Sequence, residues 1–295
     1  MLRLQKTLAR TVSVSGVGLH SGRNVSVRLR PAPAGRGIVF VRTDVGAVLP
    51  AVAEEAGRLD YATSLGERGR EVGTVEHLLS AAAGLGLDNL TVEVDGPEMP
   101  ILDGSAAPWV EEITSAGLAS LGTAARPFVV KKTLSVHGPD GKWIEVRPAS
   151  ELRISYSIDF PHPAVGRQSI SLVLSPETYA EHLAPARTFG FLAEYEALTS
   201  KGLARGASEE NCIVIGERTV LNGNLRFPDE FVRHKVLDLV GDLALVGRPV
   251  VGHVVAHRAG HALHTALARE IRQAVAGEHL RRVEPAPESV ALAGR

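Results

Sequence analysis

The chain has 295 residues, which is enough for about two domains. Hydrophobic residues make up 44% and charged residues 22%, the composition of an ordinary globular protein. Lys and Arg total 32 against 33 Asp and Glu, so no basic bias indicates a nucleic-acid partner. The single cysteine, Cys212, excludes an intramolecular disulfide and a cysteine-based zinc site, and we expect a buried, inert thiol there.

The apolar runs of the sequence are short. No stretch of about 18 uninterrupted apolar residues occurs, so no transmembrane helix is expected. Residues 1–16 also lack the continuous apolar segment of a signal peptide. We therefore expect a cytoplasmic protein without stable membrane insertion.

Strand and helix patterns alternate in the first half of the chain. A helix is predicted at 74–87, and a second one is predicted to start near Ser105 and end at Gly117. Alternating apolar residues predict four strands, at 11–19, 24–32, 37–44 and 89–96.

The pattern restarts after residues 119–127, the best linker candidate. Strands are predicted at 128–136, 142–149, 152–160 and 250–260. Helices are predicted at 175–183, 190–203 and 231–247. Each half thus contains a helix that opens with a histidine and is followed by glycine and a strand, which is a weak indication of a repeated architecture.

The predicted helix 231–247 carries a polar stripe on an otherwise apolar surface. His234, Asp238 and Asp242 are spaced by four and fall on one face. His234 and Asp238 can bind one metal ion from that face, and zinc accepts nitrogen and carboxylate ligands. A buried His–Asp hydrogen bond is the simpler alternative for this spacing.

The helix at 74–87 offers the missing parts of such a site. Glu76 and His77 are neighbours and point about 100° apart, so they suit different tasks. His77 can be a third ligand, and Glu76 can be the general base for a metal-bound water. Taken alone, the pair also fits a helix-dipole carboxylate beside a half-exposed histidine.

A second set of histidines competes for the metal. His253, His257 and His261 are spaced by four, and His264 follows. Gly252, Gly260 and the valines between them favour a strand over a helix. On that interpretation His261 lies just past the strand end and suits a catalytic acid, whereas the other three histidines have structural or surface roles.

Six separated motifs occur along the chain: "GVGLHSG", "TVEHLLSAAAGLGLDN", "PILDGSAAPW", "ARTFGF", "FVRHKVLDLVGDLALVG" and "GHALH". In their order and spacing they resemble one known family, the UDP-3-O-acyl-N-acetylglucosamine deacetylases, zinc amidases that catalyse the committed step of lipid A biosynthesis. The similarity extends from about residue 3 to about residue 270.

The resemblance implies an α+β fold of two similar domains, each with a mixed sheet and a helical layer, the helices packed face to face between the sheets. We expect an N-terminal domain at 1–122, a C-terminal domain at 123–276 with a helical insert near 189–210, and a flexible tail at 277–295.

The resemblance also implies the site. One zinc ion, for which ferrous iron could substitute, would be bound by His77, His234 and Asp238. Glu76 would be the general base and His261 the charged imidazole that stabilises the oxyanion and protonates the leaving amine. Asp242 would orient His261, Thr188 would polarise the substrate carbonyl, and Lys235 would contact substrate oxygens.

Further residues resemble the substrate contacts of the family. Phe189, Phe191 and Leu192 look like the apolar passage for the acyl chain, although core packing also explains such a run. Lys142, Phe160 and Arg258 resemble the UDP contacts. Two positions depart from the common pattern: Ala62 stands where some members have a cysteine near the metal, and Arg258 replaces a more usual lysine.

We therefore expect a monomeric enzyme whose partner is a small acylated UDP-sugar. It would hydrolyse the N-acetyl group of UDP-3-O-(3-hydroxyacyl)-N-acetylglucosamine and release acetate. A related deacetylase acting on another acylated or nucleotide sugar is the alternative. His20 has no assigned step, and the sequence leaves the acyl length open.

Overall fold

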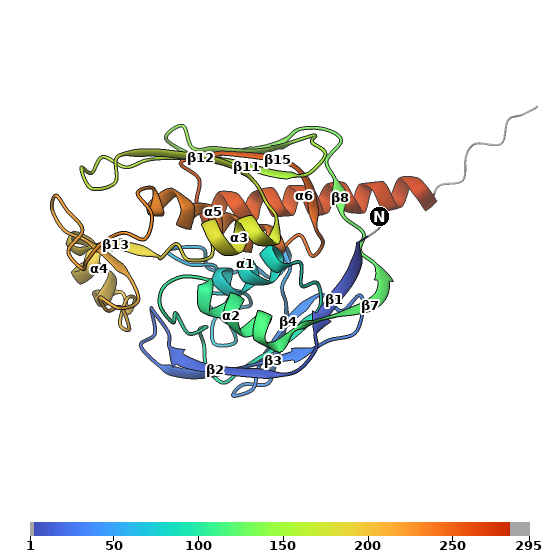
Figure 1. Ribbon diagram of the computed structural model, residues 1–295, viewed down its shortest axis with the longest axis horizontal. Helices are drawn as coiled ribbons and strands as arrows, with labels where there is room; N and C mark the ends of the chain where they lie inside the picture. The colour runs from blue at the N-terminus through green and yellow to red at the C-terminus, as the bar shows by residue number, and fades with distance from the viewer. Residues whose placement is uncertain (1–2, 284–295) are drawn as a thin grey trace, which may run out of the picture.

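The computed structural model describes residues 3–283, which form two large β-sheets with helices packed between them (Figure 1). The first half of the chain supplies one sheet and the second half supplies the other. The protein is therefore an α+β protein built from two similar halves, as the sequence predicts.

The central strand of the first sheet follows both hairpins in the sequence. Its strands are β2 (Val12–Val17), β3 (Asn24–Pro31), β4 (Ile38–Arg42), β5 (Ala47–Pro50) and β6 (Leu90–Val94). Their order in space is β2-β3-β6-β4-β5, with β6 antiparallel to β3 and parallel to β4. Along β3, buried valine and leucine alternate with exposed polar residues, so one face of the sheet packs on the core.

The second sheet repeats this topology. Its strands are β9 (Leu134–His137), β10 (Trp143–Arg147), β11 (Leu152–Asp159), β12 (Arg167–Val173) and β15 (Val250–His257), with the short β8 (Phe128–Val129) beside β15. Their order is β12-β11-β15-β10-β9, with β15 antiparallel to β10 and parallel to β11. In each sheet a late strand enters between two earlier hairpins.

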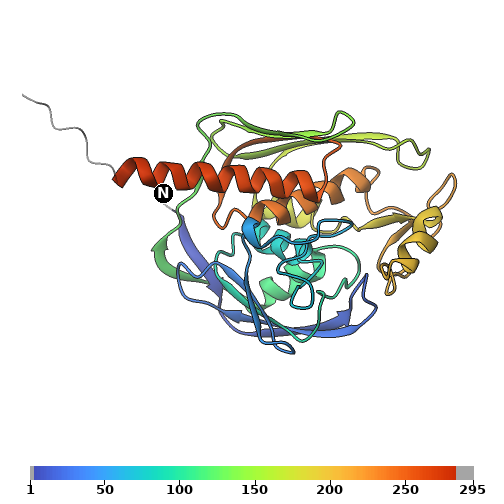
Figure 2. The same cartoon turned by 180° about the vertical axis from the view of Figure 1, so that it is seen from behind.

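Most of the helices lie in the layer between the sheets, as both views show, whereas α4 (Tyr195–Ser200) lies to one side with β13 (Phe189–Phe191) (Figures 1 and 2). Each central strand is preceded by a helix, α1 before β6 and α5 before β15, and these two helices pack against each other. The helices are α1 (Glu76–Leu85), α2 (Ala107–Ala116), α3 (Pro176–His182), α4 (Tyr195–Ser200), α5 (Glu230–Ala244) and α6 (His261–Val283), with 3-10 turns η1 (Ala53–Glu55) and η2 (Leu192–Glu194).

Small side chains let α1 and α5 approach closely. A Cβ atom on Gly241 of α5 would lie 2.1 Å from the carbonyl oxygen of Glu76, so only glycine fits at this crossing. Ser80 of α1 donates a hydrogen bond to the Leu237 carbonyl of α5 at 2.8 Å, and Tyr179 of α3 donates to Ser80. The histidine-bearing ends of the two helices are therefore held in a fixed relation.

Three segments differ from the expected elements. Residues 118–124 form strand β7 (Leu118–Ala124), which pairs with β1 (Leu4–Leu8), so most of the expected linker is a strand. The insert opens with a strand, β13 (Phe189–Phe191), because it pairs with β14 (Ile213–Ile215), and the helical η2 and α4 follow. Helix α6 includes residues 277–283, the first part of the expected tail, and 284–295 lie outside the described residues.

Among the described residues, no helix combines the length and apolarity needed to span a membrane.

Candidate metal centre and active site

Three buried side chains from α1 and α5 converge between the two halves. His77 lies in the first turn of α1, and His234 and Asp238 lie one turn apart on α5. The Nε2 atom of His234 is 3.4 Å from Asp238 Oδ1, and the Nε2 atom of His77 is 4.0 Å from the same oxygen. The structure thus brings together the three residues expected to be metal ligands, in a group that could hold an ion.

The protonation states of this group favour metal binding. Burial, followed by the nearby His234, lowers the pKa of His77 to about 3, and burial also lowers the pKa of His234. Burial alone would raise the pKa of Asp238, but His234, Lys235 and His261 outweigh it and hold that pKa well below its usual range. Neutral imidazoles and an ionised carboxylate are the forms that bind a metal.

A backbone contact orients one of the imidazoles. His234 Nδ1 lies 3.0 Å from the carbonyl oxygen of Ala186. A carbonyl oxygen only accepts, so Nδ1 carries the proton and the Nε2 lone pair is free on the side of Asp238. Two imidazoles and one carboxylate are a ligand set of catalytic zinc sites, and the residues present therefore fit a single metal ion.

Glu76 begins α1 and is almost completely buried. The backbone N–H of Thr63 donates to its Oε2 at 3.1 Å. Burial raises the pKa of Glu76 to about 8, with Asp238 and Asp242 acting in the same direction and His261 against them. The carboxylate is therefore a stronger base than one exposed to water, as proton abstraction near neutral pH requires.

His261 begins α6 and is held from its Nδ1 side. Its Nδ1 lies 2.9 Å from Asp242 Oδ2 and 3.1 Å from the hydroxyl of Thr63. Burial lowers the pKa of His261, but Asp242, Asp238 and Glu76 outweigh it and raise the pKa to about 9. Its Nε2 lies 4.0 Å from Asp238 Oδ2, so the imidazolium faces the candidate metal ligands.

Lys235 and Thr188 lie beside this group. Lys235 donates to Asp238 Oδ2 at 2.8 Å and passes over the ring of Phe189, so it is paired with a candidate ligand. Thr188 is fixed through its backbone, since its N–H donates to the Gly104 carbonyl. Arg187, the residue before Thr188, donates from its backbone N–H and its guanidinium to the buried Glu230 of α5. These bonds tie the segment that carries Thr188 to α5.

A cavity of about 970 Å³ opens over these residues. Phe160 packs against Phe189 and Phe191 with 5.8 Å between ring centroids in each pair, which gives the cavity an aromatic wall. The residue expected to contact uracil thus shares one cluster with those expected to line the acyl passage. The expected catalytic, metal and substrate residues that line the cavity are Glu76, His77, Lys142, Phe160, Thr188, Phe189, Phe191, Leu192, His234, Lys235, Asp238, Arg258 and His261.

The two expected diphosphate contacts come from neighbouring segments of the cavity lining. Lys142 is the residue before β10, and Arg258 is the residue after β15, where its backbone is left-handed with φ 51°. The Arg258 guanidinium donates to the Asp140 carbonyl at 3.1 Å, so it is turned toward the loop that precedes Lys142. Ala62 lies on the cavity wall, and Asp242 is buried behind it.

Sequence reasoning does not single out two residues near Asp242: Thr63 comes from a loop without a recognisable motif, and Tyr156 lies on β11. For His264 the sequence leaves a structural or a surface role open, and burial agrees with the structural one. His264 is fully buried with its Nδ1 2.9 Å from Asp242 Oδ2. The i, i+3 spacing of His261 and His264 was the one available signal. His253 and His257 instead hydrogen-bond serines of β11.

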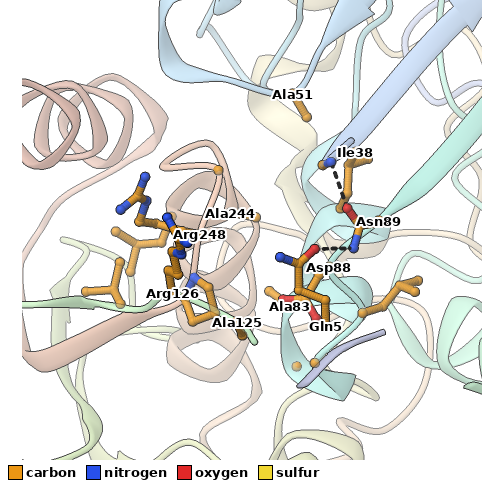
Figure 3. A pocket seen from close by; sticks show the side chains of 18 of the residues that line it. Gln5, Ile38, Ala51, Ala83, Asp88, Asn89, Ala125, Arg126, Ala244 and Arg248 are labelled. Carbon is orange, nitrogen blue, oxygen red and sulfur yellow. Dashed lines mark hydrogen bonds between the residues drawn. The ribbon is translucent and has the colours of Figure 1, made fainter. Parts of the chain in front are cut away.

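A second cavity, of about 620 Å³, lies at the opposite ends of α1 and α5 (Figure 3). Ala83 and Ala244 from these helices line it, with Arg126 and Arg248 on one side. None of the expected site residues lines this cavity, so the candidate chemistry belongs to the first one.

The family model described as "LpxC: UDP-3-O-acyl N-acetylglycosamine deacetylase" matches residues 5–273. The chain belongs to this family. Its similarity to the LpxC family therefore covers both sheets, α1, α5 and the start of α6.

Several relatives carry the name UDP-3-O-acyl-N-acetylglucosamine deacetylase. The chain is similar to that of Myxococcus xanthus, with 51% identity over 90% of this chain and 86% of the relative. For Oleidesulfovibrio alaskensis the identity is 47% over 91% and 89%, and for Anaeromyxobacter dehalogenans it is 45% over 98% and 94%.

Proposed function

We infer that this LpxC-family protein is the deacetylase that hydrolyses the N-acetyl group of UDP-3-O-acyl-N-acetylglucosamine and releases acetate in lipid A biosynthesis. The observation that carries this inference is the buried group of His77, His234 and Asp238 beneath a large, partly aromatic cavity, with Glu76 and His261 beside it. Family membership supports the same activity and the same substrate class.

We propose that His77, His234 and Asp238 hold one zinc ion, with ferrous iron as the other ion that suits this ligand set. When bound, the ion would supply Lewis-acid polarisation and lower the pKa of a water molecule. Burial lowers the pKa of both histidines, which supports this role because it favours the neutral imidazoles that bind a metal.

The remaining residues divide the proton transfers between them. Glu76 accepts the proton of the attacking water, and burial suits it to this task by raising its pKa to about 8. His261, with a pKa raised to about 9, stays protonated, stabilises the negative charge that develops on the carbonyl oxygen and donates its proton to the leaving amine. Asp242 keeps His261 oriented, and Thr188 donates a hydrogen bond to the substrate carbonyl.

Different residues of the cavity wall contact different parts of the substrate. Phe189, Phe191 and Leu192 bind the acyl chain, since apolar and aromatic surface faces the cavity there. Phe160 contacts the uracil ring. Lys142 and Arg258 face the diphosphate, and Lys235 reaches substrate oxygens while remaining close to Asp238.

We also propose the domain boundary between residues 122 and 123, with the insert near 189–210 in the second domain. A monomer is sufficient for activity, because one chain supplies Glu76 and His77 from one half and the other ligands from the other half. A cytoplasmic location agrees with the single cysteine.

Two measurements on the purified protein test the function. We expect one bound metal ion per chain and acetate release from UDP-3-O-(3-hydroxyacyl)-N-acetylglucosamine. An analogue without the acyl chain should react much more slowly, because it leaves the aromatic wall uncovered. Absence of both metal and acetate release would overturn the proposal, and equal turnover of the two compounds would favour a deacetylase for another nucleotide sugar.

A further inference from the structure

The Asp242 carboxylate is held from three directions. It is fully buried on α5, and its Oδ1 accepts a hydrogen bond from the Thr63 hydroxyl at 2.6 Å. Its Oδ2 lies 2.9 Å from His261 Nδ1 and also 2.9 Å from His264 Nδ1. Since an ionised carboxylate only accepts, both imidazoles donate from Nδ1 to the same oxygen.

His264 is fixed on its other side as well. Its Nε2 lies 2.9 Å from the Tyr156 hydroxyl, which is also within 2.8 Å of the Ala259 carbonyl just before α6. Both His264 and Tyr156 are buried. Tyr156, His264 and Asp242 therefore form a hydrogen-bonded chain that ends at His261 Nδ1. None of these three residues lines the cavity.

The Thr63 hydroxyl restrains Oδ1, but Thr63 lies on a loop and also contacts His261 Nδ1. His264 adds a second donor at Oδ2 that is anchored on β11 through Tyr156. This second donor further limits rotation of the carboxylate, and so the direction in which His261 Nε2 points. Substitution of a side chain that orients a group at a metal site through a hydrogen bond commonly lowers activity by about 10- to 100-fold.

We propose that His264 is a positioning residue of the hydrolytic reaction, which locks Asp242 through its Nδ1–H and thereby aims the His261 imidazole at the metal-ligand group. The proposal rests on the deacetylase function inferred above. It assigns His264 no contact with substrate or metal.

Two amide substitutions separate positioning from mere filling of the core. His264→Asn can place an amide N–H near the position of Nδ1 and keep the bond to Asp242, whereas His264→Gln places its amide near Nε2, toward Tyr156. We expect His264→Asn to retain most of kcat. We expect His264→Gln to lower kcat about 10- to 100-fold with KM and bound metal unchanged.

Thr265→Val is the matched control. Thr265 follows His264 on α6, is equally buried, and its hydroxyl has no partner in the described structure. This nearly isosteric change should leave kcat at the wild-type value. A fall in kcat for Thr265→Val equal to that for His264→Gln would overturn the proposal, because any disturbance of α6 would then have the same effect.

A double-mutant cycle tests whether His264 acts through Asp242. In an Asp242→Asn background, His264→Gln should cause no further loss of kcat. Full additivity of the two losses would contradict the proposal, as would equal kcat for the Asn and Gln variants of His264 in the wild-type background. Wild-type protein without acetate release would instead overturn the deacetylase function, so the two failures are distinguishable.

Discussion

Glu76 shows how burial sets the chemistry of a single residue. Its carboxylate is the proposed base, yet it is not among the three candidate ligands. Glu76→Gln keeps the shape and an oxygen for the Thr63 N–H but cannot accept a proton, so acetate release should fall by about 10²- to 10⁴-fold. Metal content should remain at the wild-type level, and the melting temperature should not fall, because a neutral amide is easier to bury than a carboxylate.

The matching control for that experiment is metal stoichiometry measured on the same samples. Turnover at the wild-type rate with metal bound would remove Glu76 from the proposed base role. Loss of metal together with turnover would instead indicate that Glu76 belongs to the ligand set.

Cys212 is the residue at which a pH dependence is simplest to predict. It lines the first cavity, and burial raises the pKa of its thiol to about 11. The thiolate is the reactive form, so at pH 8, three units below that pKa, only roughly one thiol in 1000 is reactive. The rate of alkylation by iodoacetamide should therefore keep rising as the pH approaches 11. A plateau near pH 9, as for a free cysteine peptide run in parallel, would show that the thiol is not perturbed.

At the scale of elements, the crossing of α1 and α5 couples stability to the site. Gly241 faces the backbone of Glu76, so Gly241→Ala must push α1 away at the residue that begins the helix. We expect a loss of unfolding free energy of about 1–3 kcal/mol. Acetate release should also fall under conditions in which the variant remains folded, because Glu76 and His77 move relative to α5.

Urea unfolding and acetate release on the same preparation measure both effects. Gly73→Ala is the control, since its added Cβ would meet only ordinary contacts at 3.8 Å and its backbone is not left-handed. Gly241→Ala protein with wild-type stability and turnover would show that the two helices can separate without consequence.

The whole molecule shows which features a sequence can reveal. His234 and Asp238 lie four residues apart on one helix, so their convergence is a local property that spacing predicts. Thr63 and Asp242 are 179 residues apart, and their contact depends on how the two halves pack. Phe189–Phe191 lies in the predicted helical insert, yet it forms a strand because it pairs with β14. This partner lies more than twenty residues later in the chain, so local spacing does not reveal it. Periodicity carries no information about such pairings.

The proposed metal site also links the two halves, and metal removal should therefore reduce the stability of the whole molecule. His77 comes from α1, and His234 and Asp238 come from α5. An ion that binds only the folded chain stabilises it by about 2.7 kcal/mol when its free concentration is 100 times its Kd. Without the ion, Asp238 keeps its bond to Lys235, so the chain should remain folded but melt at a lower temperature. Calorimetry before and after chelation, and again after zinc is restored, measures this shift. In His77→Ala protein, which lacks the ligand from the first half, the shift should largely disappear, and a melting temperature indifferent to measured metal loss would contradict the linking role.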